Sequence, residues 1–255
     1  MLMYKNIKDF IHSFYYPKGQ YFLISFPKTG RTWLNYMIKQ MLESASFLNK
    51  NNHQFIYNEH DTSEVIIENG FRNDPKELFE YNGRNRYRRG RVIFLVRDPR
   101  DVIVSHYYQI TQRSKNPFKF NSLSDFVKDE IIGFNRIIYF YNLWHSKREI
   151  PIEFKLVKYE DLVLDGVNTL EKISDFLNLD IHIKDLKKIY LMSSAEKMRE
   201  KELNKKLDGS NYFGSSLKQL KVRRAKIGSF IDELSDDDIE YCNNKIKNLN
   251  PYFNY

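Results

Sequence analysis

The chain has 255 residues, of which 42% are hydrophobic, and this is enough to bury one substantial core. We therefore predict a single domain over residues 1–255. The formal net charge of +8 indicates an anionic partner, and nucleotides, nucleic acids and acidic lipids all fit that description. The one cysteine, Cys242, excludes an intramolecular disulfide, so the composition fits a reducing cytoplasm.

Targeting and membrane segments are not expected. The N-terminal residues carry Lys5, Lys8 and Asp9 among apolar residues, so they lack the uninterrupted apolar core of a signal peptide. No later stretch reaches the roughly 18 apolar residues that a membrane-spanning helix needs. We expect a soluble, cytoplasmic protein that does not insert into a membrane.

The first predicted unit is a strand, a loop and a helix. Tyr21–Ser25 is a short apolar run that ends at Phe26-Pro27, which is typical of a buried strand entering a loop. Apolar residues then recur at helical spacing from Thr32 to Leu42, with Gly30 just before them.

The same pattern occurs twice more. Arg91–Val96 is a second strand, and Asp98 followed by Pro99 predicts the start of a helix. Phe154–Val157 is a third strand, followed by a helical pattern through Leu177. Strands that alternate with helices predict an α/β fold, with a central parallel sheet flanked by helices.

The remaining segments are mostly helical or loop-like. Ser122 and Ser235 each begin a Ser-x-x-acid pattern that predicts a helix start, and the second helix should reach about Leu249. Residues 205–222 have no periodicity and predict a mobile loop. The arginine-rich run of residues 84–91 is expected to be a solvated loop. RNA contact there stays open, although the chain has no nucleic-acid reader motif and no such partner is expected.

The loop SFPKTGRTW, residues 25–33, predicts an anion site. It leads from a buried strand to a helix N-terminus, where free N–H groups and the helix dipole favour a bound anion. Gly30 would admit the anion, Lys28 would neutralise it, and Thr29 and Thr32 would offer hydroxyl groups. An ordinary strand-to-helix turn is the alternative. The spacing is not GxxxxGK[ST], which disfavours an ATP or GTP hydrolase.

A second anion site is predicted after the second strand. Arg97 lies at the carboxyl end of that strand, where open parallel sheets bind ligands, and Ser105 follows within the next helix. An arginine binds phosphate bidentately, and a serine adds a hydroxyl. An ion pair of Arg97 with Asp98 or Asp101 is the alternative.

These two motifs together resemble those of the PAPS-dependent sulfotransferases, where PAPS is 3'-phosphoadenosine 5'-phosphosulfate. SFPKTGRTW is similar to the family's 5'-phosphosulfate loop, and VRDPRDVIVS to its 3'-phosphate strand and helix. VKYEDL resembles the segment whose tyrosine lies by the adenine, SSAEKMREKE an adenine-side segment, and VRRAKIGSF the RKGxxGDW element over the 3'-phosphate. The resemblance spans nearly the whole chain and is closest to small, soluble, bacterial-type members similar to cytosolic sulfotransferases.

The resemblance implies a P-loop-like nucleotide-binding sulfotransferase fold and a set of cofactor-binding residues. These are Lys28, Thr29, Gly30, Arg31, Thr32, Trp33, Arg97, Ser105, Tyr159, Ser193, Ser194, Met198, Arg223, Arg224 and Gly228. Arg31 stands where many members carry Ser or Thr, and Ser229 and Phe230 replace Asp-Trp. Ala225 replaces the first glycine of RKGxxGDW; alanine adopts a positive φ less readily than glycine, which weakens the expectation of a backbone contact to phosphate there.

In the family a histidine between the two phosphate motifs is the general base toward the acceptor, and His60 in FIYNEHDTSEV is our choice here. A hydrogen-bonded loop histidine is the alternative reading. His106 ranks second because its helix places it nearer the cofactor. His53 is a further candidate by position, whereas His12, His145 and His182 match no motif. No histidine spacing suggests zinc, and we expect no metal.

The implied reaction moves a sulfuryl group from PAPS to a hydroxyl or an amine of a small-molecule or glycan acceptor and releases adenosine 3',5'-bisphosphate (PAP). Lys28 would assist His60 by stabilising charge on the departing phosphate. A P-loop-like small-molecule kinase and a catalytically inert nucleotide-binding protein are the alternatives. The acceptor pocket is expected from the loops of residues 61–82, 113–121 and 205–222, whose shapes one sequence does not reveal.

Overall fold

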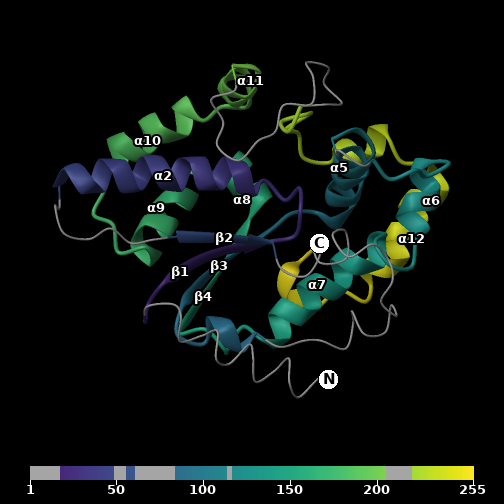
Figure 1. Ribbon diagram of the computed structural model, residues 1–255, viewed down its shortest axis with the longest axis horizontal. Coiled ribbons are helices and arrows are strands. Elements are labelled where there is room, and N and C mark those ends of the chain that lie inside the picture. Colours follow the sequence, from purple (N-terminus) through teal and green to yellow (C-terminus); the bar gives the residue numbers. More distant parts are fainter. Residues whose placement is uncertain (1–17, 49–55, 61–83, 114–116, 205–219) are drawn as a thin grey trace.

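The core of the protein is a four-stranded parallel sheet with helices on both faces (Figure 1). A computed structural model describes residues 18–48, 56–60, 84–113, 117–204 and 220–255. The strands, in the order β2-β1-β3-β4, are β1 Tyr21–Ser25, β2 Ile56–His60, β3 Arg91–Val96 and β4 Glu153–Lys158. The predicted parallel α/β fold is confirmed. β2 was not predicted as a strand, because its residues IYNEH carry too little apolar patterning.

The two faces of the sheet bury separate clusters of side chains. Phe22 and Phe94 point to one face and Leu23 and Leu95 to the other, as the two-residue period of a strand requires. The first face packs against α5 Pro99–Gln112, α6 Leu123–Lys128, α7 Phe134–Ser146 and α12 Asp236–Ile246. The second packs against α2 Arg31–Leu48, α8 Tyr159–Leu164, α9 Gly166–Phe176 and α10 Ile183–Met192. Because both faces are covered, β1 and β3 are apolar almost throughout.

The predicted helix starts are confirmed by their caps. The Asp98 side chain accepts from Arg100 N, with Pro99 at the first helical position of α5. Ser122 and Ser235 cap α6 and α12 in the same way. The ends were predicted less well: α2 continues to Leu48, and α12 stops at Ile246.

The helix predicted after the third strand is in fact two helices. The helical pattern continues to Phe176, but α8 ends at Leu164 and α9 begins at Gly166. Gly166 packs directly against Tyr190 of α10, and a Cβ there would lie 2.0 Å from the ring. This contact explains why residue 166 is a glycine, and α10 leads on to α11, Ala195–Leu203.

The arginine-rich run is only partly a solvated loop. Arg84 is 1% exposed, and its guanidinium lies 5.3 Å from the Trp144 ring centroid. The run continues as the short 3-10 helix η2, Asn85–Tyr87, before β3. The prediction is wrong for Arg84 because an arginine can bury its stem and stack on an aromatic ring.

The strand order places a crevice at the carboxyl ends of β1 and β3. The chain leaves β1 toward β2 on one side and returns to β3 on the other, so β1 and β3 flank a switch point. Open α/β sheets bind ligands at such a point. The loop after β1 and Arg97 after β3 therefore lie together.

No helix among the described residues has the length and apolar character of a membrane span. Most of the predicted loop of residues 205–222 lies outside the described part.

Candidate functional site

The loop between β1 and α2 holds itself in place. The Thr29 hydroxyl donates to Phe26 O at 3.0 Å, and Gly30 O accepts from Trp33 N and Leu34 N in the first turn of α2. Gly30 has φ 98° and lies against Tyr159, where an added Cβ would be 2.6 Å from the ring. Only glycine suits this position. The loop thereby leaves the first N–H groups of α2 available to an anion.

Most of the predicted nucleotide-binding residues line one cavity of about 580 Å³. Those that line it are Lys28, Gly30, Arg31, Thr32, Trp33, Arg97, Ser105, Tyr159, Ser194, Met198, Arg223 and Arg224. They come from the loop, α2, α5, α8, α11 and the segment 221–230, which we call the strap. Segments far apart in sequence thus form one wall.

Three predicted residues lie behind this wall. Thr29 is buried and fastens the loop. The Ser193 hydroxyl donates to Tyr190 O at 2.8 Å, and the backbone carbonyl of Ser193 accepts from the Trp33 indole N–H at 2.7 Å. Gly228 N donates to Asp101 at 2.9 Å. Through these side-chain and backbone bonds the three residues support residues that face the cavity.

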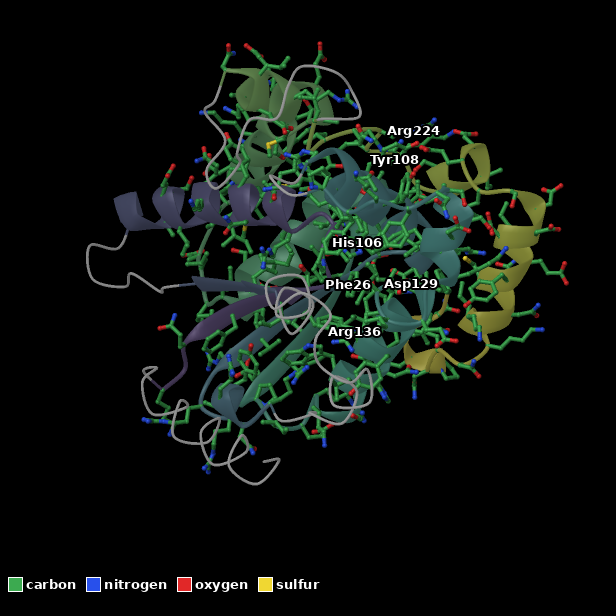
Figure 2. All side chains as sticks on the ribbon, turned by 45° about the vertical axis from the view of Figure 1, so that its right-hand side comes forward. Phe26, His106, Tyr108, Asp129, Arg136 and Arg224 are labelled. Atoms are coloured by element: carbon green, nitrogen blue, oxygen red, sulfur yellow. The ribbon has the colours of Figure 1, made fainter. Side chains whose placement is uncertain are left out.

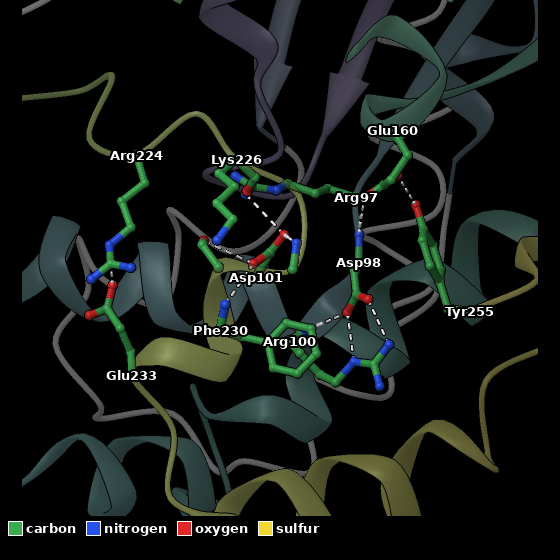
Figure 3. Close-up of polar contacts among 12 residues, drawn as sticks. Arg97, Asp98, Arg100, Asp101, Glu160, Arg224, Lys226, Phe230, Glu233 and Tyr255 are labelled. Carbon is green, nitrogen blue, oxygen red and sulfur yellow. Dashed lines mark hydrogen bonds and ion pairs between the residues drawn. The ribbon is translucent and has the colours of Figure 1, made fainter. Parts of the chain in front are cut away.

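Arg97 has three partners around its guanidinium, and Figure 3 shows two of them, Asp101 and Lys226. Nη2 lies 3.1 Å from Asp101 Oδ2 and donates to Lys226 O at 3.0 Å, while the guanidinium lies 4.4 Å from the Tyr159 ring centroid. Asp98 instead pairs with Arg100, at 2.7 Å. The ion pair with Asp101 and a place in the cavity wall are therefore compatible, and Ser105 lies on the same helix, α5.

Sequence reasoning named Asp101 only as a possible ion-pair partner of Arg97 and missed its contacts with the strap. Asp101 is 1% exposed and accepts from Gly228 N at 2.9 Å, and from the Ser229 hydroxyl and Phe230 N at 3.0 Å each (Figure 3). A carboxylate surrounded by donors in this way fastens the strap to α5. The four-residue spacing from Arg97 to Asp101 was the available signal.

α11 fixes the other end of the strap. The Arg199 guanidinium donates to Val222 O at 2.9 Å and to Arg223 O at 3.1 Å. Glu202 accepts from Lys221 N at 2.6 Å and from Val222 N at 3.2 Å. The strap is therefore attached to the helix that also carries Met198.

The strap keeps a left-handed turn although it lacks the first glycine of the family pattern. Ala225 has φ 54°, so the positive φ is kept here although alanine adopts it less readily than glycine. Gly228 has φ 71°. An alanine in this region is strained by roughly 1 kcal/mol relative to glycine, which the partners of the strap offset.

Arg223 and Arg224 share a buried carboxylate. Arg223 Nη1 forms a hydrogen bond with Glu233, and its guanidinium lies 4.2 Å from the Tyr108 ring centroid. Arg224 Nε lies 3.0 Å from Glu233 (Figure 3). Burial, followed by Glu233, raises the pKa of Tyr108 to about 12. Both arginines are thus oriented before any ligand arrives.

Lys28 lies in a cationic environment. Its Nζ donates to Gln109 Oε1 at 3.4 Å and to Lys221 O at 3.5 Å. Burial, then the positive charges of Arg113 and Lys221, hold the pKa of Lys28 well below its ordinary value. A bound anion would offset this repulsion, so the loop end of the cavity is suited to negative charge.

The two leading histidines differ in their position. His60 is the last residue of β2 and pairs in register with Ser25, so its backbone lies at the carboxyl edge of the sheet beside the loop; its side chain and residues 61–83 lie outside the described part. His106 lines the cavity between Phe26 and Phe126 (Figure 2), and neither ring nitrogen has a hydrogen-bond partner among the described residues. Burial, then the charge of Lys28, lowers the pKa of His106 to about 3. Such an imidazole accepts a proton poorly, which keeps His60 ahead of it.

The other histidines have structural surroundings or lie outside the described residues. His182 Nδ1 accepts from Lys184 N at 3.1 Å and caps α10, and His145 packs against Tyr252 with ring centroids 4.8 Å apart. His12 and His53 are not among the described residues. Within the described ranges, no three His, Cys, Asp or Glu side chains gather as metal ligands would.

Comparison with known proteins decides the family. The sequence model of the sulfotransferase domain matches residues 18–249. The chain belongs to the sulfotransferase family. It is therefore one of the PAPS-dependent sulfotransferases, the family that its two phosphate motifs resemble.

Relatives and solved structures agree with this assignment. Flavonol 3-sulfotransferase of Flaveria bidentis is 24% identical over 86% of this chain and 78% of its own length. Sulfotransferase 2A6 of Rattus norvegicus is 30% identical, over 46% of this chain and 41% of the relative. Mouse sulfotransferase SULT7A1 complexed with PAP has a TM-score of 0.61 at 18% identity, covering 91% of this chain and 84% of that one. Retinol dehydratase with androsterone and PAP has a TM-score of 0.64 at 16% identity, covering 95% and 84%. These structures share the fold of this sulfotransferase.

Proposed function

We propose that this chain transfers the sulfuryl group of PAPS to a hydroxyl of a small, largely apolar molecule and releases PAP. The observation that supports it is one cavity with two separate anion sites, the loop before α2 and the group around Arg97. PAPS carries negative charge at both its 3' and 5' ends, whereas ATP carries it at one. The proposal takes residues 1–255 as one domain, in line with the family match over residues 18–249.

The donor is assigned to the cavity by charge. The 5'-phosphosulfate belongs at the loop, where Lys28, Arg31, Thr32 and the first N–H groups of α2 favour an anion. Thr29 and Gly30 give that loop its shape. PAP-bound neighbours of the same fold support a nucleotide in this cavity.

The 3'-phosphate and the adenine take the rest of the wall. Arg97, Ser105, Arg223 and Arg224 supply charge and a hydroxyl for the phosphate, with Gly228 holding the strap behind them. The adenine would lie among Trp33, Tyr159, Ser194 and Met198, and Ser193 O holds the Trp33 indole in place.

The acceptor is assigned to the apolar part of the same cavity. Pro27, Ile110 and Phe118 line it, and Pro27 precedes Lys28 in the chain. An apolar surface of this kind buries the carbon skeleton of an alcohol or phenol and leaves its hydroxyl at the donor. One neighbour of the same fold was solved with androsterone and another with retinol, both apolar alcohols.

In the proposed reaction the acceptor oxygen attacks sulfur while the sulfur–oxygen bond to the 5'-phosphate breaks. The electron pair of that bond remains on the phosphate of PAP, where Lys28 and the N-terminus of α2 stabilise the charge. His60 receives the acceptor proton, and the position of its backbone beside the loop supports this role.

A cytoplasmic location is also part of the proposal, because a chain with one cysteine needs no oxidising compartment. That residue, Cys242, is buried, and burial raises the pKa of its thiol to about 12, so the thiol stays unreactive.

The test combines binding and transfer. Thermal shift with PAP against ATP and magnesium distinguishes this reading from a kinase. Transfer of radiolabelled sulfate to a panel of an apolar alcohol, a phenol, an amine and a glycan identifies the acceptor class. His60→Ala should lose about 10²–10⁴-fold in rate and still bind PAP. Unchanged turnover in that variant would remove His60 from the role, and PAP binding without transfer to any acceptor would favour an inert binder.

A further inference from the structure

Lys221, the first residue of the strap, lines the cavity. It lies just before the motif VRRAKIGSF, so the sequence motifs predict no role for it. Its main chain is held on both sides: Lys221 N donates to Glu202 at 2.6 Å, and Lys221 O accepts from Lys28 Nζ at 3.5 Å. The residue is therefore placed against the phosphosulfate loop by groups other than its own side chain. Its ammonium is positioned without an ion pair to any of the described residues.

The charges around Lys221 are nearly all positive. Arg31 and Arg113 repel its ammonium, and Glu202, the carboxylate nearby, already pairs with Arg113 at 3.2 Å. Burial and this repulsion lower the pKa of Lys221 to about 8. A half-buried ammonium among other cations is unfavourable until an anion reaches it. The geometry thus favours an oxyanion beside Lys28 and Lys221.

This position differs from the two phosphate sites. The 3'-phosphate group is assigned to Arg97, Ser105, Arg223 and Arg224, and the 5'-phosphate to the loop and the start of α2. Lys221 belongs to neither set, yet its backbone contacts Lys28, which stabilises the bond that breaks. The remaining anionic group of the donor is the sulfuryl group itself.

We propose that Lys221 is a second catalytic lysine, which donates hydrogen bonds to the sulfuryl oxygens of PAPS while Lys28 serves the departing phosphate oxygen. This rests on the proposed function. As the acceptor oxygen–sulfur bond forms and the sulfur–phosphate oxygen bond breaks, the sulfuryl oxygens keep their negative charge and the leaving electron pair goes to PAP. The acceptor proton still goes to His60, so Lys221 remains charged throughout.

The experiment compares PAPS with PAP in Lys221→Met and Lys221→Arg. Lys221→Met should lower kcat by about 10²-fold, because one preorganised donor to a charged centre is lost. Its affinity for PAP, which lacks the sulfuryl group, should match that of the wild type, while its affinity for PAPS should fall, so the ratio of PAPS to PAP affinity decreases. Lys221→Arg keeps the charge and should recover most of the rate. Lys188→Met, on the exposed side of α10, makes the same charge change away from the cavity and should alter neither.

Three results would overturn the proposal: wild-type kcat in Lys221→Met, an equal loss of PAP and PAPS affinity, or, with a phenol that carries a carboxylate added to the panel, a raised KM confined to that acceptor. The last would assign Lys221 to an acidic acceptor. The ratio of PAPS to PAP affinity is measured by calorimetry without an acceptor. It therefore tests Lys221 even if no acceptor in the panel is sulfated, a result that would count against the proposed function alone.

Discussion

The loop before α2 and the strap both bring positive charge to the same cavity, but they are held in opposite ways. The loop is fixed by bonds within residues 26–34, from Thr29 to Phe26 and from α2 to Gly30. The strap is fixed by Asp101, Arg199 and Glu202, which lie up to 129 residues away in sequence. A loop of the first kind forms with its neighbours, whereas the strap depends on the whole fold. The two should therefore fail for different reasons when they are mutated.

The largest effect should follow from Asp101→Asn, which weakens the contact between α5 and the strap. The change leaves Arg97 buried without its ion-pair partner. It also replaces one of the two Asp101 oxygens by an amide NH2, so either the bond from Gly228 N or the bond from Phe230 N is lost. Breaking a buried pair by removing one partner costs about 3–5 kcal/mol, so the free energy of unfolding should fall by an amount of this order. Urea denaturation and PAP calorimetry measure stability and affinity.

Asp175→Asn on the exposed face of α9 is the matched control and should change neither quantity. If Asp101→Asn unfolds like this control, the strap is held by something other than Asp101, and the contrast with the loop disappears.

Gly30→Ala changes a residue of the loop before α2 itself. Alanine at φ 98° is strained, and its Cβ would push against the Tyr159 ring, so we expect a loss of about 1–3 kcal/mol in stability. PAP affinity should fall as well, because both Gly30 and Tyr159 line the cavity.

Gly19→Ala separates the two causes. Gly19 also has a positive φ, of 81°, but an added Cβ there meets nothing within 4 Å. It should show only the conformational loss and bind PAP normally. Equal PAP affinities in the two variants would show that contact with Tyr159 is unimportant.

The smallest effect should come from Ala225→Gly in the strap. Glycine relieves the strain at φ 54°, and after its greater freedom in the unfolded chain is allowed for, we expect a gain of about 0.5–1 kcal/mol. Thermal unfolding with and without PAP measures it. Ala195→Gly in the first turn of α11 should act in the opposite direction, and a loss in both would mean that the strap does not need a left-handed residue at 225.

Much of the fold was predictable because its signals are local. The apolar runs of β1, β3 and β4, the caps Asp98, Ser122 and Ser235, and the loop at Gly30 depend on neighbouring residues alone. Features that depend on distant partners were missed. These include the break before Gly166, the close packing of Gly166 against Tyr190, and the burial of Arg84 against Trp144.

The same division runs through the site. The order and spacing of its motifs were enough to determine the family and to predict two anion sites, because each motif carries its own charges and its own helix N-terminus or strand end. Only the tertiary structure decided that Arg97 pairs with Asp101, that Ala225 adopts the left-handed turn, and that Lys221 lies against Lys28. Electrostatic pairing and steric fit depend on distance in space, and the strap reaches the loop only when the sheet and α11 have brought them together.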